Sequence, residues 1–290
     1  MSFDPVVTFG TIAAAALIGL GVGNAIDGTS PRSRVPVAAA ELVTLTAGSY
    51  EHPQPGEFLK DNRPIPAPVA KETIDAPLEI MKFQVTASDY DRCVSDSACK
   101  PADSRIVGDV PVTGVSFLDA QAYANWLSEK TGETWRLPTD VEWAYVAAER
   151  FRADIEAGEG DPADPARRWL ALYRNEAALG RKADPEPRPP GAFGANTKGV
   201  ADIAGNVWEW TSTCYAHVTM SSDGARIANS VSNCGVHVVE GFHRTYMSNF
   251  IRDGKSGGCA VGTPPDNLGF RLVHDSGGFL QATFRRLGLT

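Results

Sequence analysis

A regular pattern of apolar residues follows Ser116. Apolar side chains recur there at spacings of three and four residues, which places them on one face of a helix that begins at Ser116 and stops before Gly132. The Ser116 hydroxyl is a suitable N-cap, and Asp119, three residues later, completes a capping box. The residues of the apolar face are Phe117, Ala120, Ala124 and Leu127.

A second helix is predicted from Thr139 to about Arg150, because Thr139 is an N-cap residue with Glu142 three positions later. Elsewhere, apolar runs such as LEIMKFQVT at residues 78–86 indicate short strands. The 28 Gly and 20 Pro residues favour many turns. These features predict an irregular α+β fold in one domain, residues 41–275, followed by a C-terminal tail at residues 276–290.

The N-terminus has a different pattern. Residues 5–26 carry no charge over 22 positions and would span about 33 Å as a helix, enough to cross a bilayer. We therefore expect a transmembrane anchor within residues 1–27 and a Pro/Ser/Ala-rich linker at residues 28–40. A signal peptide is the alternative, since Gly23-Asn-Ala25 resembles a cleavage site, but the first four residues lack its basic region. Arg32 and Arg34 favour a cytoplasmic position for the chain after the anchor.

The composition restricts the classes of partner that the chain is expected to bind. With 43% hydrophobic and 21% charged residues the chain is globular, and its formal net charge is −8. No Lys/Arg-rich run is present, and phosphate binding depends on such basic patches. Nucleic acid is therefore not an expected partner.

The cysteines favour an oxidising compartment instead of the cytoplasm. Cys93 and Cys99 lie in the polar sequence RCVSDSACK, where a disulfide across a short loop is expected. Cys214 and Cys234 flank a polar segment with few apolar residues to stabilise it, so a disulfide between them would be useful. Cys259 is the odd cysteine, and spacing alone leaves any pairing among the last three open.

The sequence ADIAGNVWEW, residues 201–210, suggests a cation site. Gly205 and Asn206 tolerate unusual backbone angles, so a tight turn there could direct carbonyls to one point while Asp202 and Glu209 add carboxylate oxygens. Calcium accepts six to eight such oxygens in a flexible shell. The alternative is an ordinary turn, with Trp208 and Trp210 in the core and Glu209 in solvent.

Several motifs in this order resemble the formylglycine-generating enzyme family, also called sulfatase-modifying factor domains. They are APLEIMKFQVTASDY, PVTGVSFLDAQAYANWLSEKTGETWRLPTDVEWAYVAA, GVADIAGNVWEWTS and NLGFRLV. The resemblance implies a compact, loop-rich relative of the C-type lectin fold over residues 41–275. It also implies a structural calcium ion held by the side chains of Asp202 and Glu209 and by the carbonyls of Gly205 and Val207.

The chain departs from this family in a late segment. Generating enzymes have an approximate Arg-Gly-Gly-Ser sequence and then two cysteines that bind copper(I), which requires soft thiolate ligands. Here the segment reads HVVEGFHRTYMSNFIRDGKSGG, with Glu240-Gly241-Phe242 in place of Arg-Gly-Gly and no cysteine before Cys259. We therefore expect no conversion of cysteine to formylglycine.

The same region still contains a cluster of polar and aromatic side chains. If locally helical, His243 and Met247 would form an i, i+4 pair with copper-binding atoms, although packing and hydrogen bonding are the commoner roles. Neither copper nor iron is expected. The candidate pocket residues are His237, His243, Arg244, Tyr246, Arg252, Cys259 and Arg271, with Asp253 nearby.

Two classes of function follow. In the first, the domain is an accessory or maturation factor on the periplasmic side of a bacterial cytoplasmic membrane, where it binds a membrane or periplasmic protein. The segment from Cys234 to Pro265 looks like the variant in accessory proteins associated with copper nitrite reductase in denitrifying bacteria. In the second, the protein is an oxidase or oxygenase with a different metal set.

Overall fold

The computed structural model describes residues 40–152, 186–254 and 267–275. All of them belong to one compact unit, residues 36–290. The predicted membrane segment, almost all of the linker and the C-terminal tail lie outside the described residues. Within the described ranges, no helix is both long and apolar enough to cross a bilayer.

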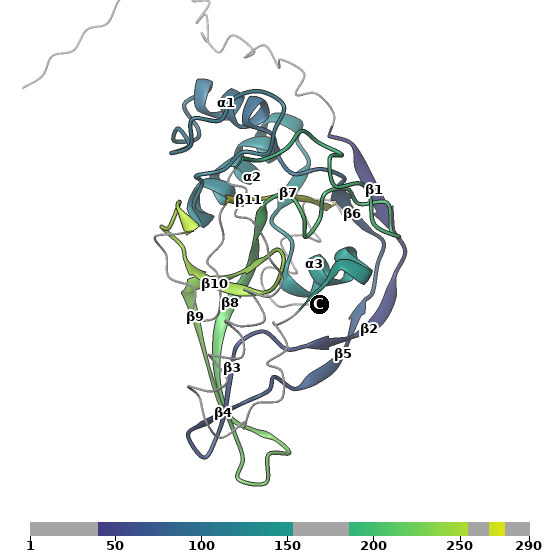
Figure 1. The fold of residues 1–290 in the computed structure, drawn as a ribbon, viewed down its shortest axis with the longest axis vertical. Coiled ribbons are helices and arrows are strands. Elements are labelled where there is room, and N and C mark those ends of the chain that lie inside the picture. Colours follow the sequence, from purple (N-terminus) through teal and green to yellow (C-terminus); the bar gives the residue numbers. More distant parts are fainter. Residues whose placement is uncertain (1–39, 153–185, 255–266, 276–290) are drawn as a thin grey trace, which may run out of the picture. The chain divides into compact units, whose positions relative to one another are not determined.

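Three α-helices lie in the described part of the domain (Figure 1). They are α1 (Ala87–Ser95), α2 (Phe117–Thr131) and α3 (Asp140–Ala147), and α3 is followed by the 3-10 helix η1 (Ala148–Arg150). Both predicted capping boxes are present, at Ser116 with Asp119 and at Thr139 with Glu142. Gly132 ends α2 with a φ of 76°, a left-handed conformation that suits glycine.

A short strand is present within residues 78–86, as predicted. It is β6 (Leu78–Met81), and after a short loop α1 begins directly after its N-cap, Thr86. The Thr86 hydroxyl accepts a hydrogen bond from the Asp89 backbone N–H at 3.1 Å, which caps the first turn of α1.

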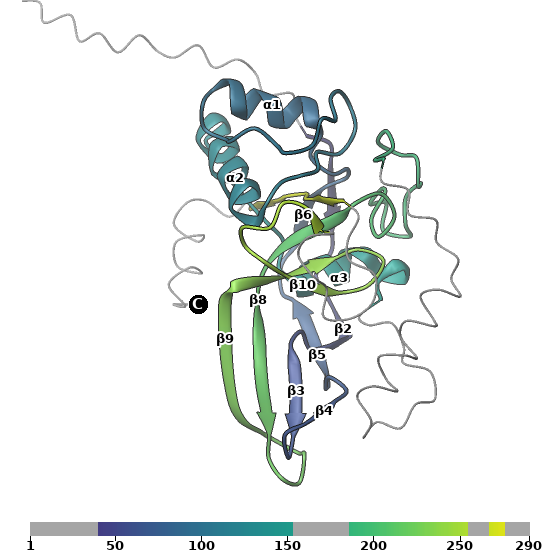
Figure 2. The ribbon, with the colours of Figure 1, turned by 60° about the vertical axis from the view of Figure 1, so that its left-hand side comes forward.

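The strands of the described residues form three sheets. The four-stranded sheet has the antiparallel order β1 (Leu42–Leu45), β6, β12 (Val273–Asp275) and β7 (Thr134–Arg136). The six-stranded sheet has the order β10 (Thr245–Ser248), β9 (Ile227–Glu240), β8 (Trp208–Met220), β3 (Glu57–Lys60) and β4 (Arg63–Ile65), and β11 (Leu268–Gly269) pairs parallel with β8. β2 (Gly48–Pro53) pairs with β5 (Val69–Ile74). The long strands β8 and β9 run side by side (Figures 1 and 2).

Among the described residues, three apolar clusters hold these elements together, of which the smallest joins β3 to β8 through Phe58, Val218 and Met220. The two larger ones involve the helices. One packs α1 and α2 against β8 and β11 through aromatic side chains that include Tyr90, Tyr123, Trp210 and Phe270. The other packs α3 against the four-stranded sheet. Trp208 and Trp210 are both buried, as the ordinary-turn alternative expected, but Glu209 is also completely buried rather than in solvent.

Both predicted disulfides are present. Cys93 pairs with Cys99 and Cys214 with Cys234, with Cα atoms 5.3 and 4.6 Å apart. Their surroundings differ, because Cys93 and Cys99 are buried beside α1 and Cys234 is exposed on β9. Cys259 lies outside the described residues.

Candidate functional site

The predicted pocket residues do not form one cluster. Arg271 and Arg244 enter two separate buried charge networks, and His237 lies beside the Cys214–Cys234 disulfide. Arg252 is bound by the carboxylates of Asp103 and Asp119, each at 2.7 Å, near the start of α2. Each network is described in turn below.

Arg271 neutralises Glu209 in the protein interior. Its Nε lies 2.6 Å from Oε2 of Glu209 and its Nη2 lies 2.8 Å from Oε1. Trp143 donates its indole N–H to Oε2 at 2.9 Å, and Gln84 donates its side-chain amide to Oε1 at 2.8 Å. A carboxylate has about four lone-pair positions, so these donors fill the acceptor capacity of Glu209.

This arrangement does not fit the predicted role of Glu209 as a calcium ligand. A guanidinium already supplies the positive charge, and no acceptor position is left for a cation. Asp202 uses its two carboxylate oxygens to accept backbone N–H groups of Gly191 and Phe193, at 2.5 and 2.8 Å. These bonds attach the preceding loop to the turn, so both acidic side chains have structural partners.

The unusual backbone angles of this turn occur at other residues than the predicted Gly205 and Asn206. Asp202 and Ala204 have φ values of 57° and 56°. A non-glycine residue in the left-handed region is strained, and here the Asp202 hydrogen bonds hold the strained conformation. Gly205 is needed for space instead, since a Cβ atom there would lie 3.2 Å from the Phe193 ring.

Arg244 lies in a second buried network, between α3 and strands β2 and β9. Its Nε is 2.9 Å from Oε1 of Glu240, and its Nη2 is 3.0 Å from Oδ2 of Asp140. His52 Nε2 lies 2.6 Å from the same Asp140 oxygen, so the imidazole donates an N–H to it. All four side chains are at most 4% exposed.

Oε2 of Glu240 and Oδ1 of Asp140, two carboxylate oxygens of this network, have no hydrogen-bond partner among the described residues. A proton on one of the two carboxyl groups would reduce the repulsion between them. Burial, reinforced by the negative charge of Asp140, raises the pKa of Glu240 well above its ordinary value. Burial opposes ionisation of Asp140 too, but Arg244 and the hydrogen bonds outweigh it and lower its pKa. We therefore assign the proton to Glu240.

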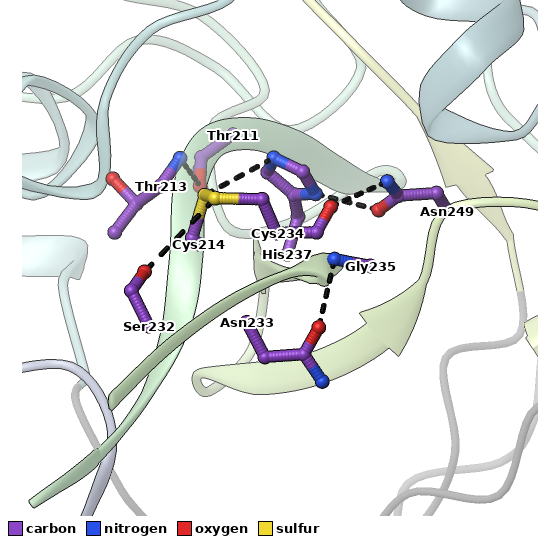
Figure 3. The surroundings of a disulfide bond; sticks show 9 residues. All are labelled: Thr211, Thr213, Cys214, Ser232, Asn233, Cys234, Gly235, His237 and Asn249. Carbon is purple, nitrogen blue, oxygen red and sulfur yellow. Dashed lines mark hydrogen bonds between the residues drawn. A yellow bond between two sulfur atoms is a disulfide. The ribbon is translucent and has the colours of Figure 1, made fainter.

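His237 faces the Cys214–Cys234 disulfide (Figure 3). Its Nε2 lies 3.8 Å from the Cys214 sulfur, and its Nδ1 lies 2.6 Å from Oδ1 of Asn249. The Phe117 ring from the start of α2 stacks on the imidazole, with centroids 3.7 Å apart. Burial lowers the pKa of His237, and the hydrogen bond with Asn249 opposes this only in part.

The other predicted residues have structural contacts. The Tyr246 hydroxyl accepts the Gly56 backbone N–H at 2.7 Å. The His243 ring packs edge-on against Trp208, and its Nδ1 lies 2.8 Å from the Arg244 carbonyl oxygen. The helical pair of His243 with Met247 is wrong, because Met247 lies on the strand β10 and is buried.

Sequence reasoning missed the partners that define these networks. The residues that were not predicted to belong to a site are His52, Gln84, Phe117, Asp140, Trp143, Glu240 and Asn249. Most lie far along the chain from the residues they contact, so no local motif joins them. In the described part of the chain, no group of three or more His, Cys, Asp or Glu side chains is arranged to hold a metal.

With this geometry established, comparison with known proteins defines the family. Residues 29–276 match the sulfatase-modifying factor enzyme 1-like domain, so the chain belongs to that family. The fold is similar to the solved structure of PvdO from Pseudomonas aeruginosa, with a TM-score of 0.52, 20% identity, and coverage of 83% of this chain and 96% of that one.

Curated relatives include active and inactive proteins. The chain is 40% identical to the formylglycine-generating enzyme of Mycobacterium tuberculosis over 110 residues, 36% of this chain and 33% of that protein. It is 36% identical to hercynine oxygenase of Mycolicibacterium smegmatis over 114 residues, 37% of this chain and 23% of that protein. It is 30% identical to inactive C-alpha-formylglycine-generating enzyme 2 of Bos taurus over 173 residues, 58% of this chain and 52% of that protein. The chain thus covers about half or less of each of these three relatives.

Proposed function

We propose that this protein is an accessory or maturation factor without formylglycine-generating activity. It is tethered by residues 5–26 to a bacterial cytoplasmic membrane, with the domain on the periplasmic side. There it binds a protein partner, and a periplasmic copper nitrite reductase is the partner that the sequence of the late segment favours. Calcium is not required for this proposal.

The state of the cysteines is the observation that carries the proposal. Four of the five cysteines are joined in two disulfides, so at most one thiol remains, that of Cys259. Copper(I) bound by two adjacent thiolates needs a free pair. The similarity to a relative named as inactive supports a family member without this chemistry.

An exposed strand edge supports a protein partner. On the outer side of β9, residues 227–235 pair with no strand among the described residues, and all nine are exposed. Val231, at 54% exposed, lies in the middle of this edge. Unpaired backbone groups of an exposed edge can pair with an extended segment of another protein.

The absence of thiol oxidation is tested with a sulfatase-type peptide that contains the target cysteine. The purified full chain, supplied with copper(I), oxygen and a reductant, is expected to leave the peptide mass unchanged. Cys259→Ser is the matched control. Conversion of thiol to aldehyde by the wild-type chain that is lost in Cys259→Ser would contradict the proposal and identify an enzyme.

The partner is tested by co-expression with a periplasmic copper nitrite reductase. We expect copper per reductase subunit and nitrite reduction to fall several-fold when this chain is absent. Val231→Lys should have the same effect, because a charge on the strand edge disfavours pairing. The matched control is Val69→Lys on β5, where the native valine is 59% exposed. Equal copper loading with and without the chain would contradict this partner.

Similarity to hercynine oxygenase favours a second candidate, a metal-dependent oxidase or oxygenase acting on a protein or small molecule. Metal analysis of the full chain purified from its native membrane distinguishes the two. Stoichiometric copper or iron would support the oxygenase. The accessory function is expected to give neither metal at stoichiometric amounts.

A further inference from the structure

The two disulfides of this domain have different access to other molecules. Cys93 is fully buried and Cys99 is 8% exposed, within the cluster of α1 and α2. By contrast, Cys234 is exposed and Cys214 is partly exposed, on adjacent strands. A thiol from another protein can therefore approach the Cys234 sulfur and not the first disulfide. Exposed disulfides are the ones most open to exchange.

The hydrogen bonds around His237 determine which ring nitrogen carries its proton. The side-chain amide of Asn249 donates to the Cys234 carbonyl oxygen at 2.7 Å, so its own oxygen must be the atom facing His237. Nδ1 of His237 therefore donates an N–H to Asn249. The unprotonated Nε2 then presents its lone pair to the Cys214 sulfur at 3.8 Å (Figure 3).

A disulfide with a purely structural role needs no oriented imidazole beside it. Phe117 fixes the plane of the imidazole, and the Asn249 hydrogen bond fixes its tautomer. A neutral, oriented imidazole beside a sulfur can accept the proton of a thiol and favour the reactive thiolate. The disulfide itself provides the second sulfur.

We propose that Cys214–Cys234 is a thiol–disulfide exchange site for a dithiol on a partner protein, and that Nε2 of His237 accepts the proton of the Cys214 thiol once the pair is reduced, so that Cys214 can act as a thiolate in the reverse reaction. One partner thiolate attacks Cys234 Sγ, a mixed disulfide forms, and the Cys214–Cys234 bond breaks with its electron pair on Cys214, which then takes up a proton. The second partner thiol loses its proton and attacks the mixed disulfide at the partner sulfur, and Cys234 leaves and is protonated. In total, two electrons and two protons pass from the partner dithiol to Cys214 and Cys234. This inference is independent of the proposed accessory function.

The first test uses the unmodified full chain. It is equilibrated with increasing dithiothreitol, free thiols are trapped by alkylation, and peptides containing each cysteine are quantified by mass spectrometry. We expect Cys214 and Cys234 to be alkylated at reductant concentrations at least about tenfold below those that open Cys93–Cys99. Opening of both disulfides together, or of Cys93–Cys99 first, would overturn the proposal.

The second test measures the contribution of His237 in the chain with Cys214 and Cys234 reduced. The rate of Cys214 alkylation is measured against pH in the wild-type chain, in His237→Phe, which keeps a ring to stack on Phe117, and in the matched control His217→Phe, at an exposed histidine of β8 that contacts Glu57. We expect His237→Phe to shift the Cys214 profile to higher pH and lower its rate at pH 7 by about tenfold, while His217→Phe retains the wild-type profile. A Cys214 profile unchanged by His237→Phe would show that the imidazole only packs there, and would overturn its assigned role.

Discussion

At the scale of single residues, this domain is organised by two buried arginines. Arg271 and Arg244 are 0% and 4% exposed. Arg271 pairs with the carboxylate of Glu209, and Arg244 pairs with those of Asp140 and Glu240. Removing one partner from such a pair leaves a buried charge without compensation, which costs about 3–5 kcal/mol in other proteins. Both arginines therefore act in the interior, which explains why neither contributes to the pocket that sequence predicted.

The Glu240 proton makes stability depend on pH. Because the folded-state pKa of Glu240 is raised, its contribution is fully present below the unfolded pKa, about 4.3, and is lost as pH rises through the folded pKa. Between the unfolded-state and folded-state pKa values, Glu240 lowers the unfolding free energy by about 1.4 kcal/mol for each unit of rising pH. Glu240→Gln does not titrate, and it keeps a donor for Asp140 and an acceptor for Arg244. We expect its stability relative to wild type to rise from pH 5 to pH 8, measured by urea unfolding.

Asp140→Asn is the control with the opposite sign. The lowered pKa of Asp140 means that its stabilisation is present above the unfolded pKa and lost as pH falls through the folded pKa. Asp140→Asn should therefore be destabilised by about 3–5 kcal/mol at pH 7, since Arg244 loses an anionic partner. A stability difference between Glu240→Gln and wild type that is constant with pH would contradict the assigned proton.

The Arg271–Glu209 pair predicts the response to calcium removal. Because the guanidinium fills the acceptor positions of Glu209, a chelator should leave the melting temperature within about 1 °C of its original value, and Arg271→Ala should cost about 3–5 kcal/mol. The control Arg252→Ala removes a partly exposed pair and should cost about 1 kcal/mol or less. A fall in melting temperature on chelation that added calcium reverses would instead restore the predicted calcium site.

At the scale of elements, sequence predicted what short-range interactions determine. The starts of α2 and α3 depend on side chains three residues from their caps, and both were found. Likewise, both disulfides join cysteines within stretches whose polar character is visible locally. The short strand within residues 78–86 was also found, as β6, because an apolar run is a local pattern.

The candidate site was harder to predict because its contacts are remote in sequence. Glu209 and Arg271 are 62 residues apart, and Asp140 and Arg244 are 104 apart. Because charged side chains are rarely buried unless they are paired, the sequence suggested that these four residues are exposed or bind a ligand. Only the strand order, in which β11 and β9 both flank β8, brings these side chains together inside the domain.

At the scale of the whole molecule, the two disulfides link fold to compartment. In the chain-entropy model, a closed loop of this size contributes about 2 kcal/mol for Cys93–Cys99 and about 3 kcal/mol for Cys214–Cys234. Domains of this kind have a total stability of roughly 5–15 kcal/mol. Because disulfides persist in oxidising compartments, these two bonds support the proposed periplasmic position over the cytoplasmic position that Arg32 and Arg34 favour.

That position is tested with the full chain in bacterial cells. If residues 5–26 anchor the chain and the domain faces outward, as proposed, the chain should remain with membranes after alkaline carbonate extraction and its domain should be digested by protease added to spheroplasts. Non-reducing peptide mapping of the same membranes should recover Cys93 joined to Cys99. A chain starting at residue 28 and produced in a reducing cytoplasm should lack both disulfides and lose up to about 5 kcal/mol of stability. Recovery of Cys93 and Cys99 as free thiols from native membranes, with the domain protected from protease, would place it in the cytoplasm and give Arg32 and Arg34 the deciding role.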